Sequence, residues 1–133
     1  MPELPEVQSA ANYIKPFLLH QTITTIKPLN NFTKVFDTHS YDKINELVEG
    51  QRIINVSRRG KYIIIDLDKG FICIHLRMTG QLQTQLTDQD NKKHFTAIIS
   101  LQNGEKLYFK DYRKFGRFYY YESLDILENK LGR

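Results

Sequence analysis

The chain has 133 residues, 41% hydrophobic and 26% charged, a balance typical of one globular domain and unlike that of a disordered chain. Its 19 Lys and Arg against 15 Asp and Glu give a formal net charge of +4, which favours a nucleic-acid partner only weakly. The single cysteine, Cys73, excludes an internal disulfide and a cysteine-cluster zinc site, and no apolar run approaches the length of a bilayer span.

The first thirty residues predict a helix followed by a strand. Apolar residues at helical spacing predict a helix over residues 5–19, with a kink at Pro16 or a second short segment after it. The β-branched run TITTIK, residues 22–27, predicts a strand that Pro28 ends.

Residues 30–50 predict a loop and then a second helix. Residues 30–40 have no clear period, which favours a loop that contains a short strand. Ser40 is then placed to cap a brief helix that Gly50 ends. The apolar face of this helix would consist of Ile44, Leu47 and Val48.

From residue 51 onward the composition is that of β-structure. Six strands are predicted, over residues 51–59, 61–67, 70–76, 95–101, 105–111 and 116–122. The polar run 83–93 predicts a loop, and Ser123 precedes a final helix with apolar contacts from Leu124, Ile126, Leu127 and Leu131. These elements predict an α+β, mainly β fold: a two-layer antiparallel β-sandwich flanked by an N-terminal and a C-terminal helix.

The N-terminal stretch MPELPEV admits a structural and a chemical interpretation. Proline and carboxylates suit the first turn of a helix. If Met1 is removed, however, Pro2 has a free secondary amine, a group with a pKa of about 8 in model peptides. Such an amine can attack an aldehyde-like carbon to give a cationic iminium, with Glu3 as general acid. If Met1 is retained, the nitrogen of Pro2 is an amide, and we expect no such chemistry.

Lys61 lies at the predicted start of one strand, and Met78 lies just after the predicted end of another. Lys61, in SRRGKY, is either a solvated charge at a strand mouth or a phosphate contact that also lowers the pKa of a neighbouring amine. Met78, in HLRMTG, would by default be buried in the core. An exposed methionine at this position would instead be able to wedge into a base stack.

Two later segments mix basic and aromatic residues. His94, in NKKHF, is either a surface residue or a donor to a phosphate. In KDYRKFGRFYYYE, the aromatics from Phe118 onward are expected to pack in the core. Arg113 and Phe115 precede Gly116, where a loop would let a guanidinium read a base edge and a phenyl ring stack on a base.

In this order, PELPEV, the lysine of RRGKY, HLRMTG and DYRKFG resemble the formamidopyrimidine-DNA glycosylase family, bacterial enzymes that excise oxidised purines. The resemblance runs over essentially the whole chain. Arg77 stands where the family often has glycine, and Tyr112-Arg113-Lys114 replaces the usual Pro-Arg-Arg. The endonuclease VIII group, which acts on oxidised pyrimidines, usually has glycine where this chain has Leu4, so it is the second interpretation.

The resemblance implies a role for each matching residue. Among the catalytic residues, Pro2 would be the nucleophile toward the sugar C1′, and Glu3 would be the acid that opens the ring. Glu6 would support the site, and Lys61 would donate a proton and contact a phosphate. The DNA-binding group would be Met78, Arg113 and Phe115, which fill the gap left by the flipped lesion, with His94 and Lys114 on the backbone. Arg113 would meet the orphaned cytosine. The implied reaction is base excision through a Schiff base, followed by β,δ-elimination.

The resemblance also implies a domain organisation. Residues 1–133 would be the N-terminal catalytic domain, and the helix-two-turn-helix and zinc-finger domains of the family would lie outside this chain. No cofactor or metal is then expected in the chain, since the zinc belongs to the missing domain. We expect a monomer in the bacterial cytoplasm, associated with the nucleoid, whose partner is double-stranded DNA with oxidised purines. We expect the isolated chain to be inactive or weakly binding; a DNA-binding module without catalysis is the remaining alternative.

Overall fold

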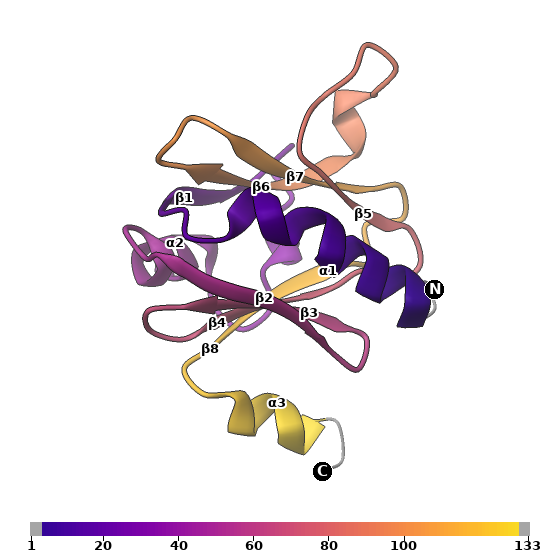
Figure 1. Ribbon diagram of the computed structural model, residues 1–133. Helices are drawn as coiled ribbons and strands as arrows, with labels where there is room; N and C mark the ends of the chain where they lie inside the picture. Colours follow the sequence, from indigo (N-terminus) through magenta and orange to yellow (C-terminus); the bar gives the residue numbers. More distant parts are fainter. Residues whose placement is uncertain (1–3, 131–133) are drawn as a thin grey trace.

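Two four-stranded antiparallel sheets face each other in the computed structural model, which describes residues 4–130 (Figure 1). One sheet has the strand order β1-β6-β7-β5 and the other β2-β3-β4-β8. The strands are β1 Ile23–Pro28, β2 Ile53–Arg59, β3 Tyr62–Leu67, β4 Phe71–His75, β5 Gly80–Gln83, β6 Phe95–Leu101, β7 Lys106–Asp111 and β8 Arg117–Tyr121. The helices are α1 Leu4–Leu18, α2 Tyr41–Val48 and α3 Leu124–Lys130, with 3-10 turns η1 Thr33–Val35 and η2 Lys92–His94. The predicted fold class is confirmed.

The sheet β2-β3-β4-β8 is covered on both faces. Because side chains alternate along a strand, Ile63 and Ile65 of β3 enter the main core between the sheets, whereas Ile64 faces the opposite side. There it packs with Cys73 and with Leu127 of α3. A strand buried on both faces carries a continuous apolar run instead of an alternating one, which explains the sequence YIIIDL.

Helix α1 packs against β2 and also touches β3 and β5, so it contacts both sheets (Figure 1). Its buried face consists of Val7, Ala11, Ile14 and Leu18, at helical spacing. The helix continues through Pro16 to Leu18, so the second short segment, one of the two predicted alternatives, does not form. Pro16 removes one N–H bond to the carbonyl of Asn12, and both residues are exposed, so water can satisfy that carbonyl.

The second helix begins and ends as predicted. The Ser40 hydroxyl accepts a hydrogen bond from the backbone N–H of Lys43 at 3.3 Å and so caps α2. Gly50 has φ +80°, a left-handed conformation that suits glycine. Within residues 4–130, no helix combines the length and apolar character that crossing a bilayer requires.

Two local predictions are wrong, and one strand was not predicted. The predicted short strand in residues 30–40 is replaced by η1 and an isolated parallel bridge between Phe36 and Phe118. Strand β5 was not predicted, because GQLQ has little β propensity and becomes a strand only by pairing with β7 at the sheet edge. Ile126 is 48% exposed, since Leu127, about 100° further round the helix, is the residue that faces the sheet. Leu131 lies outside the described residues.

Candidate nucleic-acid interface

The turn between β2 and β3 carries Lys61. Arg59 and Tyr62 are paired across the hairpin, so Gly60 and Lys61 form its two-residue turn. Lys61 therefore lies in the turn itself. The sequence had predicted this lysine in the first position of the strand. A two-residue hairpin turn favours positive φ, and Gly60 has φ +60°.

The connections β4–β5 and β7–β8 expose the next three predicted residues. Met78 is 47% exposed and Phe115 is 44% exposed, although both are apolar. The exposure of Met78 agrees with the alternative interpretation of this residue, and its default assignment to the core is wrong. The guanidinium carbon of Arg113 lies 5.0 Å from the centre of the Phe115 ring, so these two side chains form one unit.

Hydrogen bonds join these two connections directly. The Thr79 hydroxyl donates to Asp111 Oδ1 at 2.5 Å, and the backbone N–H of Arg113 donates to Thr79 Oγ1 at 3.0 Å. Met78 is therefore adjacent in the chain to Thr79, which makes both hydrogen bonds, and Arg113 makes one of them through its backbone N–H. The structure brings Met78, Arg113 and Phe115 together at one end of the molecule.

The beginning of α1 lies at the same end. Glu6, Ala10 and Tyr13 line a cavity of about 290 Å³ together with Leu76 and residues 80–83 of the β4–β5 region. Gln8 Oε1 accepts a hydrogen bond at 3.0 Å from Nε of Arg58, which lies just before the β2–β3 turn. The start of α1 thus lies between the turn of Lys61 and the segment of Met78 (Figure 1). Pro2 and Glu3 lie outside the described residues.

His75, at the end of β4, is a site residue that the sequence did not single out. Burial, and then the positive charges of Arg77 and Lys61, lower its pKa from 6.5 to about 4. Its Nδ1 accepts a hydrogen bond from the backbone N–H of Arg77 at 3.1 Å, and the centre of its ring lies 4.9 Å from that of Tyr62, edge to face. The sequence signal was weak because a histidine that ends an apolar strand looks like a core residue.

The two remaining predicted residues flank the β7–β8 connection. His94, in η2, is half-buried, and its ring centre lies 4.5 Å from that of Tyr112, which is next to Arg113. Lys114 is half-buried, and its Nζ lies 5.7 Å from the centre of the Phe32 ring. His94 is therefore adjacent to the loop of Arg113, whereas the Lys114 side chain is directed toward Phe32.

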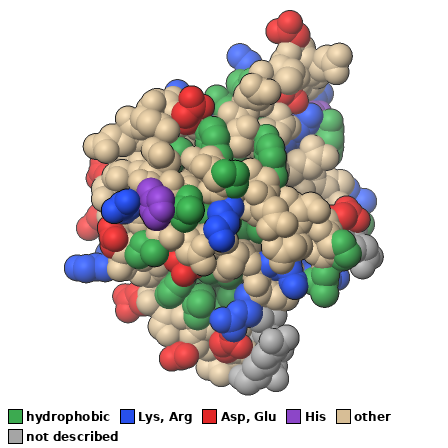
Figure 2. Space-filling view, viewed as in Figure 1, with side chains coloured by type: hydrophobic (Ala, Val, Ile, Leu, Met, Phe, Trp, Pro, Cys, Tyr) green, Lys and Arg blue, Asp and Glu red, His purple; other side chains and the backbone are tan. Residues whose placement is uncertain are grey.

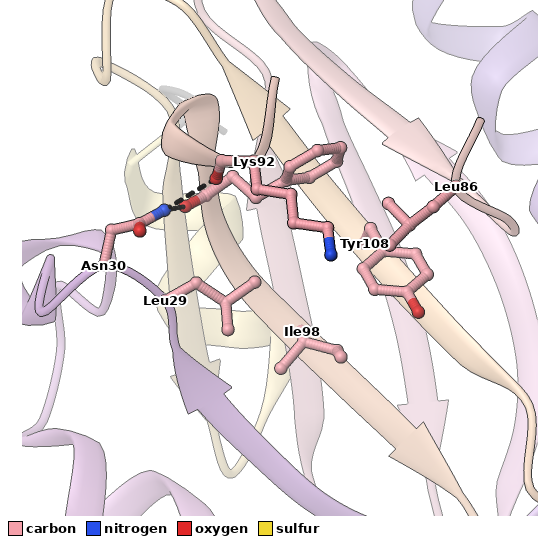
Figure 3. A pocket seen from close by; sticks show the side chains of 7 residues that line it. Leu29, Asn30, Leu86, Lys92, Ile98 and Tyr108 are labelled. Carbon is pink, nitrogen blue, oxygen red and sulfur yellow. Dashed lines mark hydrogen bonds between the residues drawn. The ribbon is translucent and has the colours of Figure 1, made fainter. Parts of the chain in front are cut away.

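A separate cavity of about 300 Å³ lies on the outer face of the sheet that contains β1, β6 and β7 (Figure 3). It is lined by Leu29, Asn30, Leu86, Lys92, Phe95, Ile98 and Tyr108. The Asn30 side chain closes one side by donating to the carbonyls of Lys92 and Phe95, both at 2.8 Å. This cavity shares no lining residue with the loops of Met78 and Arg113, so it is not part of the candidate interface.

The described part of the chain does not fit a metal ion. Residues 4–130 contain no group of three His, Cys, Asp or Glu side chains placed to bind one.

Comparisons with known proteins agree with this architecture. Residues 1–118 match the family model described as the formamidopyrimidine-DNA glycosylase N-terminal domain. Formamidopyrimidine-DNA glycosylases of Legionella pneumophila strain Paris and Herpetosiphon aurantiacus are 41% and 37% identical over 120 and 119 residues, which cover 90% and 89% of this chain. The chain spans 43% of the length of each of these relatives.

Solved structures agree as well. Lactococcus lactis Fpg in complex with DNA that contains an abasic site has a TM-score of 0.85 and 26% identity, over 98% of this chain and 48% of that one. The same protein with DNA that contains Fapy-dG has a TM-score of 0.84 and 27% identity, also over 98% and 48%. The chain belongs to the formamidopyrimidine-DNA glycosylase family, and it corresponds to the N-terminal domain of that family.

Proposed function

We propose that this chain is the catalytic domain of a bifunctional DNA glycosylase and abasic-site lyase that removes oxidised purines in base excision repair. The matched family model and the curated relatives of L. pneumophila and H. aurantiacus, named formamidopyrimidine-DNA glycosylases, support the oxidised-purine class. The partner is double-stranded DNA, and structures of the L. lactis relative contain DNA with an abasic site or with Fapy-dG. Zinc plays no part in the steps assigned here.

The observation that carries the proposal is the convergence of separate motifs at one end of the fold. The start of α1, the turn of Lys61, and the connections of Met78 and Arg113 come from four distant parts of the sequence. Exposed methionine and phenylalanine side chains there, with a guanidinium beside them, suit a surface that enters a base stack. Lys61 supplies a positive charge on the same side.

In the proposed reaction, the secondary amine of Pro2 attacks C1′ of the damaged nucleotide, and the bond from C1′ to the base breaks. Glu3 protonates the ring oxygen as the sugar opens, which leaves a cationic iminium. This cation is an electron sink, so the phosphates on both sides of the sugar are lost in turn by β,δ-elimination. Glu6 supports this site, and Lys61 donates a proton and contacts a phosphate.

The remaining predicted residues hold the DNA. Met78, Arg113 and Phe115 fill the gap that the flipped nucleotide leaves, with Arg113 meeting the cytosine opposite. His94 contacts the phosphate backbone. Lys114 is the weaker backbone contact, because its ammonium group already lies over Phe32.

Borohydride trapping on a duplex with one abasic site tests this proposal, with intact-protein mass as the readout. Two preparations are compared: protein without Met1, and protein that retains Met1 because methionine aminopeptidase was inhibited. The proposed chemistry gives a covalent DNA adduct that maps to Pro2 in the first preparation, at most in low yield because the isolated chain is expected to be inactive or to bind DNA weakly, and none in the second. Lys61→Ala should reduce the adduct, whereas Lys43→Ala, on the distant helix α2, should not.

Two outcomes would contradict the proposal: an equal adduct on the protein that retains Met1, and an adduct on another residue. The absence of an adduct on the Met-free protein agrees with the expected inactivity of the isolated chain, and the same test on a chain that includes the remaining domains then decides. Binding of abasic-site DNA by that longer chain without trapping would favour a DNA-binding module.

A further inference from the structure

Asp111, the last residue of β7, is completely buried, with 0% of its surface exposed. It is the only Asp, Glu, Lys or Arg in residues 4–129 that is buried in this way. A buried carboxyl group is costly unless its oxygens are hydrogen-bonded, so the contacts of Asp111 show what this burial accomplishes.

The carboxyl oxygens of Asp111 bind two different segments of the chain. Oδ1 accepts from the Thr79 hydroxyl at 2.5 Å and from the Arg113 N–H at 3.2 Å, whereas Oδ2 accepts from the Gly116 N–H at 2.7 Å. Thr79 belongs to the β4–β5 connection, and Arg113 and Gly116 belong to the β7–β8 connection. One side chain therefore sets the distance between the two connections.

Both connections contain a strained residue directly before the exposed apolar side chain. Arg77 and Lys114 each have φ +57°, a left-handed conformation that is uncommon outside glycine, and they precede Met78 and Phe115. Such conformations persist only where neighbouring contacts hold them. The bonds to Asp111 lie within two residues of each strained position, so they are placed to hold both.

The packing around Asp111 also leaves little freedom. A Cβ atom at Gly116 would lie 2.4 Å from Cζ of Phe109 and 2.9 Å from Oδ2 of Asp111. A Cβ atom at Gly80 would lie 2.7 Å from the same Phe109 atom. Both connections thus approach one buried ring closely, and Gly116, in the second connection, and Gly80, directly after the first, permit that approach.

We propose that Asp111 is a positioning residue that holds Met78 on one connection, and Arg113 with Phe115 on the other, at the spacing needed to enter a duplex at one base pair. This inference rests on the proposed function. Asp111 is buried and touches no DNA; it acts through the two loops that it joins.

The test compares binding of two duplexes of the same sequence, one undamaged and one with a tetrahydrofuran abasic-site analogue opposite pyrrolocytosine, a fluorescent cytosine analogue. The variants are Asp111→Asn and Thr79→Val, with Thr79→Ser as the matched variant that keeps the hydroxyl. Leu107→Ala, a buried change on the same strand β7, controls for general loss of stability. The readouts are the two dissociation constants and the change in fluorescence on binding.

We expect Asp111→Asn and Thr79→Val to lower the preference for the abasic duplex by about tenfold while affinity for the undamaged duplex stays the same. The change in pyrrolocytosine fluorescence on binding should also be smaller in these two variants than in the wild-type chain. Thr79→Ser should retain the preference, and Leu107→Ala should change both affinities by one common factor, because it alters only the folded fraction. Thr79→Val keeps the test decisive if Asp111→Asn does not fold.

The inference is overturned if folded Asp111→Asn or Thr79→Val keeps the preference of the wild-type chain. In that case, loss of preference in Met78→Ala or Arg113→Ala would show that the proposed function stands and only the role of Asp111 fails. A wild-type chain that binds both duplexes equally would overturn the proposed function and this inference together.

Discussion

His75 illustrates how a single residue can acquire a property that its sequence context hides. Its neighbours in the chain are apolar residues of β4 and Leu76, yet the folded structure places it against Tyr62 and within reach of two cations, Lys61 and Arg77. The pKa of the imidazole is lowered by burial first and by these charges second. At neutral pH the ring is therefore uncharged, and its Nδ1 is able to accept the hydrogen bond from Arg77.

This shift makes stability depend on pH in a defined direction. The folded pKa of about 4 is lower than the unfolded value of 6.5, so the unfolded chain binds the proton more readily. The stability due to neutral His75 is complete above pH 6.5 and is lost as the pH falls toward 4. We expect His75→Gln to flatten this acid-side loss by on the order of 1 kcal/mol, because partial exposure screens the charges.

Urea unfolding of both proteins at about pH 7 and about pH 4.5, on either side of the unfolded pKa, measures this difference. Equal pH dependence in the variant and the wild-type chain would contradict the lowered pKa. His20→Gln, at an exposed histidine before β1, is the matched control for the exchange of a histidine for glutamine.

At the scale of elements, the β3–β4 hairpin depends on one glycine. Gly70 has φ +83°, and a Cβ there would lie 2.1 Å from the hydroxyl oxygen of Tyr120. That hydroxyl donates to the carbonyl of Lys69 at 3.2 Å, and the ring is buried, so a Cβ at this position displaces the ring and breaks this hydrogen bond. The hairpin and the neighbouring strand β8 therefore fit together only with glycine at this position.

We expect Gly70→Ala to lower the free energy of unfolding by about 2–4 kcal/mol, from left-handed strain plus displacement of a buried ring. Gly50→Ala is the matched control, because Gly50 has φ +80° but open space around its Cα. Its cost should be only about 1 kcal/mol of backbone strain. Chemical denaturation of Gly70→Ala and Gly50→Ala separates the backbone strain from the collision with Tyr120. Equal losses of unfolding free energy in the two variants would show that the Tyr120 side chain moves to admit the new Cβ.

Helix α3 is attached to the sandwich by its own small apolar cluster. Leu127 is completely buried against Ile64 and Tyr121, and Arg59 of β2 forms an ion pair with Glu128. We expect Leu127→Ala to cost about 2–3 kcal/mol, since it leaves a cavity, whereas Ile126→Ala, at the exposed neighbouring position, should change stability by less than about 0.5 kcal/mol. Thermal unfolding followed by circular dichroism measures both. Similar effects of the two changes would contradict the observed docking of α3.

At the scale of the whole molecule, charge is spread and not concentrated. On the face shown in Figure 2, Lys and Arg side chains are interspersed with Asp and Glu, in keeping with a net charge of only +4. Under the proposed function, the affinity for DNA therefore depends on a few local cations, among them Lys61, and not on a general positive surface. Because each phosphate that a cation neutralises releases counterions, removing one such cation should weaken the salt dependence of the affinity by a fixed step.

We expect Lys61→Ala to weaken binding of abasic-site DNA and to reduce the slope of log affinity against log salt by about 1, the value for one phosphate contact. Lys43→Ala, on α2, should leave both unchanged. Fluorescence anisotropy between roughly 50 and 200 mM salt, the range over which counterion release is large, provides both slopes. An unchanged slope for Lys61→Ala would show that this lysine touches no phosphate.

Much of the fold was predictable because its signals are local. The apolar periodicity of α1, the cap at Ser40 and the β-branched runs each depend on a few neighbouring residues, and each element formed with shifts of one or two positions at its ends. Strand β5 was not predictable, because its four residues become extended only through pairing with β7. Ile126 was misplaced because periodicity alone does not say which side of a short helix meets the sheet.

The candidate site, like the fold, was predictable from the sequence only in part. The sequence by itself determined the motifs, their order and the family, since these depend on the identity of residues such as those of PELPEV and HLRMTG. Only the tertiary structure decided that Met78 is exposed, that His75 lies beside Lys61, and that buried Asp111 joins the loops of Met78 and Arg113. Exposure, pKa and loop spacing arise from contacts between segments that are far apart in the chain, and no local pattern of residues contains them.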